Sequence, residues 1–105
     1  MEAKLLEVNG VELTLLKNFP TQLSIVVFGS ASTLGWTNTK LVPHVYITPP
    51  SDGFFEFDLV GTPPSGVAGE MITPIVISHV MTDIPAEFKG ARVYASLNRL
   101  ESAFT

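Results

Sequence analysis

The sequence predicts an all-β protein, an antiparallel β-sandwich of Ig-like or Greek-key type with about seven short strands. Eight glycines and eight prolines divide the chain into short segments. Between Gly10 and Gly90 the longest segment free of both runs over 75–84, which leaves little room for an average helix of about 11 residues. Val, Ile and Thr, which favour pleated and half-buried surfaces, make up 27 of the 105 residues. Many short strands separated by turn residues are typical of a sandwich.

The chain length predicts a single domain over 1–105. Hydrophobic residues make up 46% of the chain and charged residues 15%, which excludes intrinsic disorder. A net charge of −4 argues against a nucleic-acid partner and against a polybasic membrane-surface protein. We expect no membrane span and no signal peptide, because no long apolar run occurs and none follows the charged first residues. The compartment stays open between the cytoplasm and a trimmed secreted or periplasmic form.

The first expected elements are two strands and a turn. Leu5–Val8 and Val11–Thr14 flank Asn9-Gly10, the dipeptide that most favours a two-residue hairpin turn. Gln22–Phe28 is the next strand, and its apolar residues on both faces predict a central position in a sheet.

A second hairpin is expected in the middle of the chain. Lys40–Thr48 forms one strand, in which Pro43 indicates an edge or a bulge. Pro49–Gly53 makes the turn, and Phe54–Val60 is the partner strand.

The remaining segments follow in order. Gly61–Gly69 is a loop, and Glu70–Val80 is a long apolar strand that contains Pro74. At most one short helical turn is expected, near 85–89. Ala91–Leu97 is the last expected strand, and 98–105 fits a helix, a strand or a tail.

The central hairpin carries the most concrete candidate site. If Thr48 pairs with Phe54, alternation places four polar residues on one face, with Tyr46 opposite Glu56 and His44 opposite Asp58. The other face, with Val45, Ile47, Phe55 and Phe57, is then expected in the core. The polar face suits metal binding or acid–base chemistry, or it is an ordinary solvated face with cross-strand pairs. Zinc normally needs three or four His or Cys ligands, and the chain has two His and no Cys, so no metal or cofactor is expected.

A second candidate site is the polar loop before the only tryptophan. Gly29–Gly35 contains hydroxyl groups, but it lacks the Gly-Lys-Ser/Thr ending of a phosphate-binding loop and the second glycine of a nucleophile elbow. Trp36 is either an exposed interface anchor or a plug at one end of the sandwich. The candidate binding residues here are Ser32, Thr33, Trp36 and Asn38.

The sequence leaves enzymatic activity open but argues more against it than for it, and the leading hypothesis is a non-catalytic protein-binding domain. A mean hydropathy of +0.35 is high for a small domain, and exposed apolar patches usually mark partner surfaces. Leu23–Phe28 and Ile72–Ile77 are the expected sources of such patches, and Gly29–Thr39 and Gly61–Gly69 are the expected contact loops, as in an inhibitor that inserts loops into a cleft. An open edge strand also predicts self-association, most simply a dimer. The alternatives are a small-molecule or metal-binding domain that uses the His44 face, or a structural subunit of an assembly.

Overall fold

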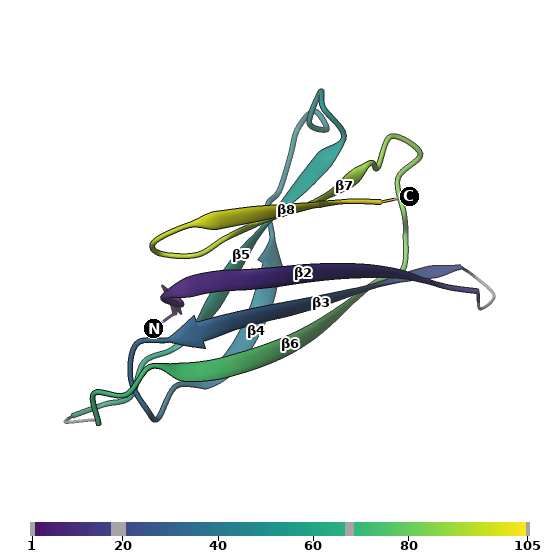
Figure 1. Cartoon of the computed structure of the whole chain (residues 1–105). Coiled ribbons are helices and arrows are strands. Elements are labelled where there is room, and N and C mark those ends of the chain that lie inside the picture. The colour runs from purple at the N-terminus through teal and green to yellow at the C-terminus, as the bar shows by residue number, and fades with distance from the viewer. Residues whose placement is uncertain (1, 18–20, 67–68, 105) are drawn as a thin grey trace.

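The computed structural model describes residues 2–17, 21–66 and 69–104 and confirms the all-β sandwich. Eight strands form two sheets, and the described residues contain no helix (Figure 1). In chain order the strands are β1 (Ala3–Lys4), β2 (Glu7–Leu16), β3 (Gln22–Ala31), β4 (Thr37–Pro43), β5 (Phe54–Thr62), β6 (Thr73–Met81), β7 (Gly90–Tyr94) and β8 (Arg99–Ala103). No helix in this part of the chain is long and apolar enough to cross a membrane.

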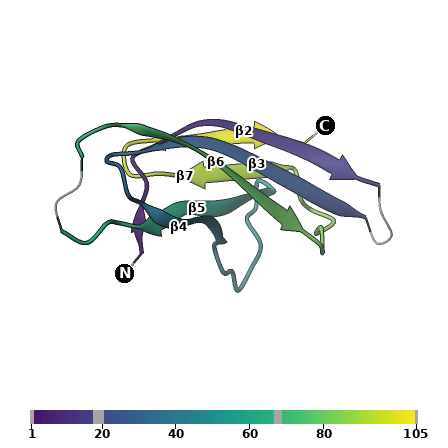
Figure 2. The same cartoon turned by 90° about the horizontal axis from the view of Figure 1, so that it is seen from below.

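The two sheets differ in size and pairing. The three-stranded sheet has the order β2-β3-β6 and is antiparallel throughout. In the five-stranded sheet β4 pairs with one side of β5, β1 and β7 pair with β5 as well, and β8 pairs with β7. The pair β5–β7 is parallel, because β6 crosses to the other sheet between them. Figure 2 shows β2, β3 and β6 as one layer lying across the other.

The core lies between the sheets and is made of alternate residues of each strand. Leu23, Ile25 and Val27 of β3 are fully buried and belong to the same core cluster as Phe57 and Leu59 of β5. Burial of a side chain of this size contributes about 1.5–3 kcal/mol. The opposite faces of both sheets remain open to solvent.

Asn9-Gly10 does not form the predicted hairpin. β2 runs through both residues with a bulge between Val8 and Gly10, and β3 pairs with β2 from Glu7 to Leu16. The ten-residue strand β3 offers more pairing than a local hairpin could, so the long-range pairing overrides the turn preference of the dipeptide. The Asn9 side chain instead donates a hydrogen bond to Ser30 Oγ at 3.2 Å.

Three other expectations concern the C-terminal part of the chain. The segment before β7 holds a single turn, closed by a hydrogen bond from Phe88 N to Pro85 O at 3.1 Å, and no helix. In the segment 98–105, left open between helix, strand and tail, Arg99–Ala103 form the edge strand β8, and Thr105 lies outside the described residues. The expected strand 91–97 is shorter, because the chain turns after Tyr94 to enter β8.

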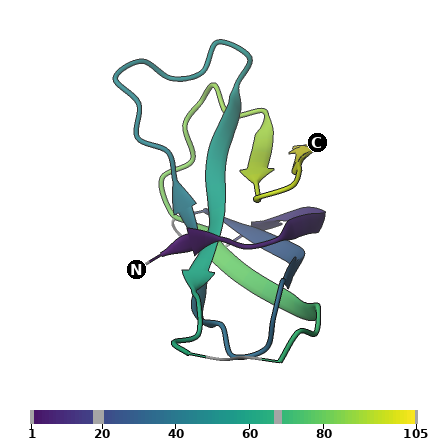
Figure 3. The ribbon, with the colours of Figure 1, turned by 90° about the vertical axis from the view of Figure 1, so that its left-hand side faces the viewer.

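The central hairpin exists, but its first strand ends early. β4 stops at Pro43, and the long connection to β5 rises clear of the sheets (Figure 3). The expectation that Val45 and Ile47 lie in the core is therefore wrong, since both side chains are fully exposed. Phe57 is buried as expected, and Phe55 packs against the core from its margin. Pro43 is indeed on an edge strand, because β4 pairs only with β5 among the described strands.

Candidate functional site

The four polar residues of the central hairpin come together on the outer face of the five-stranded sheet. His44 Nε2 lies 2.9 Å from Asp58 Oδ1, and the Tyr46 hydroxyl donates to Glu56 Oε1 at 3.0 Å. The strand register differs from the expected one by two residues, with Val42 opposite Asp58. A shift of two keeps every side chain on its face, so the expected partners still meet.

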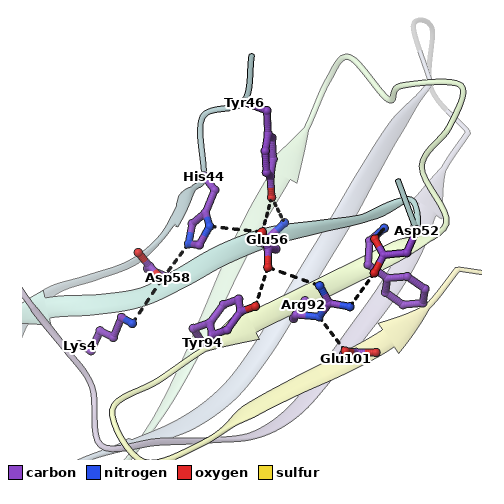
Figure 4. A network of polar contacts seen from close by, with 10 residues as sticks. Lys4, His44, Tyr46, Asp52, Glu56, Asp58, Arg92, Tyr94 and Glu101 are labelled. Atoms are coloured by element: carbon purple, nitrogen blue, oxygen red, sulfur yellow. Dashed lines mark hydrogen bonds and ion pairs between the residues drawn. The ribbon is translucent and has the colours of Figure 1, made fainter. Parts of the chain in front are cut away.

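Strands β1, β7 and β8 extend this group into a larger network, which we call the polar patch, and β1 contributes Lys4. β7 places Arg92 beside Glu56 and Tyr94 beside Asp58, and β8 places Glu101 beside Arg92. The polar patch consists of Lys4, His44, Tyr46, Asp52, Glu56, Asp58, Arg92, Tyr94 and Glu101 (Figure 4).

Glu56 is the centre of the polar patch. Its Oε2 accepts a hydrogen bond from the Tyr94 hydroxyl at 2.5 Å, and Arg92 Nη1 lies 3.4 Å away. The backbone N–H of Glu56 donates to the Tyr46 oxygen at 2.9 Å. The hydrogen bond from Tyr94, ahead of those from Tyr46 and Arg92, lowers the pKa of Glu56 against the opposing effect of burial. Glu56 is therefore ionised at neutral pH.

Arg92 joins three carboxylates with three different nitrogen atoms. Nη2 lies 2.9 Å from Asp52 Oδ2, Nε lies 2.7 Å from Glu101 Oε1, and Nη1 faces Glu56. The hydrogen bond to Asp52, followed by that to Glu101, raises the pKa of Arg92 further above its already high value. The same bond to Arg92 lowers the pKa of Asp52. This fork-like use of the guanidinium group is one that lysine cannot reproduce.

His44 is held from three sides. Its ring stacks on Tyr94 with a centroid separation of 5.6 Å and an angle of 14°. Besides the contact with Asp58, His44 Nδ1 lies 3.7 Å from Glu56 Oε1.

Burial is the main cause that raises the pKa of Tyr46, which neighbours His44 in the polar patch. The Tyr46 hydroxyl therefore stays protonated and continues to donate its hydrogen bond.

The polar patch satisfies its own polar groups. Each of its charged side chains has an opposite charge within 4.0 Å, and no buried side-chain polar atom of the described residues lacks a partner. The described part of the chain forms no pocket, and no three His, Asp or Glu side chains in it are placed to hold a metal ion. The network instead ties the β4–β5 connection to the sheet through His44 and Tyr46 at one end and Asp52 at the other.

Sequence reasoning missed five members of the polar patch: Lys4, Asp52, Arg92, Tyr94 and Glu101. The alternation of Arg92, Val93 and Tyr94 was visible and places the two polar residues on one face. The sequence did not show the parallel pairing of β7 with β5, because the strands of a parallel pair are not joined by a short turn with a recognisable sequence.

The second candidate group lies toward the other end of β5. Trp36 is half-buried, packs against the core, and lies over Gly61, where an added Cβ would come 3.2 Å from its ring. Its Nε1 donates to Thr33 Oγ1 at 3.1 Å. Ser32 and Asn38 are exposed, and Asn38 has a φ of 50° at an irregularity in the β4–β5 register. Trp36 thus packs on the core and supports the loop beside it, and its role as an interface anchor stays a prediction.

The two loops expected to form a contact surface do meet. Leu34 N donates to Gly69 O at 3.1 Å, and Met71 N donates to the same oxygen at 3.0 Å. Within the expected loop Gly61–Gly69, Val67 and Ala68 lie outside the described residues. Leu34, Met71 and Ile72 are exposed by 43%, 60% and 62%, and we call these three residues the loop cluster.

Comparison of the chain with known protein families, curated proteins and solved structures finds no match.

Proposed function

We propose that this domain is a non-catalytic protein-binding module that contacts its partner through the loop cluster. One observation carries the proposal. A backbone hydrogen bond from Leu34 N to Gly69 O joins two segments far apart in the sequence at one end of the sandwich, and these segments expose Leu34, Met71 and Ile72. A group of large apolar side chains on a braced loop surface is typical of a protein contact site.

The support beneath the loop cluster favours this function. Trp36 packs on the core and bonds Thr33, directly before Leu34. On the other loop, Thr73 Oγ1 donates to Met71 O at 2.9 Å, just before β6 begins. A contact surface fixed in advance loses less conformational entropy when it binds.

The polar patch supports the alternative, a small-molecule or metal site, less well. Its groups already pair with one another, and no pocket among the described residues would exclude water from a ligand. In that alternative His44→Ala abolishes ligand or metal binding while the fold persists. Unchanged binding in His44→Ala would remove the alternative.

The experiment compares how well two double variants capture a partner protein. Each variant lacks two exposed apolar side chains. Leu34→Ser/Ile72→Ser alters the loop cluster, and Val45→Ser/Ile47→Ser alters the exposed β4–β5 connection. The proposal predicts a protein that wild type and the second variant capture and that the first does not. Since all four side chains are exposed, both variants should keep the wild-type stability within about 0.5 kcal/mol. Equal capture by both variants would contradict the proposal.

A further inference from the structure

β6 leaves one of its two edges without a strand partner. Within the described residues it pairs only with β3, over nine positions from Thr73 to Met81. Figure 1 shows β6 on the outer side of β3. The backbone N–H and C=O groups that face away from β3 are therefore free to pair with another strand.

β6 differs from every other strand that has a single strand partner. Charged residues occur in β1 (Lys4), β2 (Glu7, Glu12), β4 (Lys40) and β8 (Arg99, Glu101), but none occurs in β6. Charged side chains on edge strands oppose pairing between molecules, and natural proteins use them for that purpose. Protection by charge is thus present at each of these edges except that of β6, where Pro74 near the start of the strand is the only residue without an N–H.

The side chains of β6 suit a neighbouring strand. Those on the outer face are exposed, with Val76 at 64% and Val80 at 45%, and Ser78 lies between them. The inner face is packed, with His79 edge-on to Phe57 at 5.7 Å. Burial lowers the pKa of His79, so β6 carries no charge at neutral pH.

We propose that β6 pairs with β6 of a second copy of this chain and joins the two three-stranded sheets into one of six strands. A strand that pairs with itself in the antiparallel sense obeys two-fold symmetry, and an uncharged strand does so without like charges meeting. Pro74 has no N–H, so the pairing uses Ile75–Met81 and has its centre at Ser78. Val76 then lies opposite Val80 of the second copy, and Ser78 lies opposite Ser78 of the second copy.

The strand pair sets the arrangement of the dimer. Since Ile72 directly precedes β6, an antiparallel pair holds the two loop clusters at opposite ends of the shared strands. This last point rests on the proposed function, whereas the dimer itself does not. A single strand pair makes a small interface, so the dimer forms only at high concentration.

The test measures molar mass by light scattering from about 10 μM to about 1 mM, a range suited to weak association. Wild type should approach twice 11.3 kDa as the concentration rises. Ser78→Lys places two charges face to face at the centre of the pair and should weaken the dimer at least about tenfold, a change of about 1.4 kcal/mol. Thr14→Lys is the matched control, because Thr14 is exposed on the same sheet but on the opposite edge strand β2, and this variant should dimerise like wild type.

Amide hydrogen exchange of the wild-type protein gives a second measurement that needs no variant. Amides of β6 should become more protected as the concentration rises, while those of β2 should not. A wild type that stays monomeric throughout, a Ser78→Lys variant that dimerises like wild type, or protection of β2 in place of β6 would overturn the proposal. None of these outcomes bears on capture of a partner by the loop cluster.

Discussion

The side chain of Asn98 binds both backbone polar groups of Val8, across 90 positions of the chain. Asn98 Oδ1 accepts from the Val8 N–H at 2.8 Å, and Asn98 Nδ2 donates to the Val8 carbonyl at 2.8 Å. The amide thus replaces a strand partner at the bulge of β2, and it joins the β7–β8 turn to the other sheet. Ser96 N and Leu97 N strengthen the same junction by donating to Leu5 O and Leu6 O.

Replacement of Asn98 by Ala should therefore lower the free energy of unfolding by more than is usual for an exposed residue. Val8 is buried, and an unsatisfied buried backbone group costs about 1–3 kcal/mol. We expect Asn98→Ala to lower the free energy of unfolding by about 2–3 kcal/mol in urea denaturation. Ser96→Ala in the same turn is the control and should change it by less than about 0.5 kcal/mol. Equal stability of the two variants would show that the Asn98 bonds are not needed.

Acid should destabilise the protein through Glu56. The Tyr94 hydroxyl is the main cause that keeps the pKa of Glu56 below its ordinary 4.5. The stabilisation from ionised Glu56 is therefore complete above about pH 4.5 and is lost as the pH falls through the lower folded-state pKa. Tyr94→Phe should lower stability by about 1–2 kcal/mol at pH 7 and should reduce the further loss between pH 7 and pH 3.

Urea denaturation at both pH values checks this prediction. Tyr46→Phe is the comparison, because the Tyr46 hydrogen bond lowers the pKa of Glu56 less than the Tyr94 hydrogen bond does. An acid dependence in Tyr94→Phe as large as in wild type would assign the pH effect to another group.

Arg92→Lys tests whether the polar patch depends on the guanidinium fork. A single ammonium group cannot reach Asp52, Glu56 and Glu101 together as Arg92 does. We expect a loss of about 1–2 kcal/mol in the free energy of unfolding. Arg99→Lys is the matched control, because Arg99 is exposed and lies only over the Tyr94 ring at 6.0 Å. If both variants lose the same stability, the fork has no special role.

Trp36→Ala tests the support beneath the loop cluster. The substitution removes packing against the core and the hydrogen bond to Thr33. We therefore expect the free energy of unfolding, measured by thermal unfolding, to fall by about 3 kcal/mol. Trp36→Phe should lose about 1 kcal/mol, since it keeps most of the packing but not the N–H donor. A wild-type Tm for Trp36→Ala would mean that the indole ring has little part in bracing this end.

The sequence was sufficient for the fold class and for one face of the central hairpin. Period-two alternation placed His44, Tyr46, Glu56 and Asp58 on one face. This prediction holds despite a two-residue error in register, because side chains return to the same face of a strand every two residues. The Asn9-Gly10 hairpin does not form because a local turn preference of small energy competes with nine paired positions between β2 and β3.

Features that depend on contacts between distant segments could not be predicted. The parallel pair β5–β7 brings Arg92 and Tyr94 to Glu56 across 36 and 38 positions of the chain. The exposure of Val45 and Ile47 follows from the early end of β4, and a run of alternating residues gives no sign of where pairing stops.

Site-specific photo-crosslinking tests the central claim of a protein-binding loop cluster most directly. A photoreactive residue replaces Ile72 of the loop cluster in one sample and the fully exposed Ile47 in another, both in a Ser78→Lys chain so that self-association adds no product. We predict a discrete heavier adduct from position 72 and none of that mass from position 47. The absence of any adduct from position 72, or the same adduct from both positions, would contradict the account.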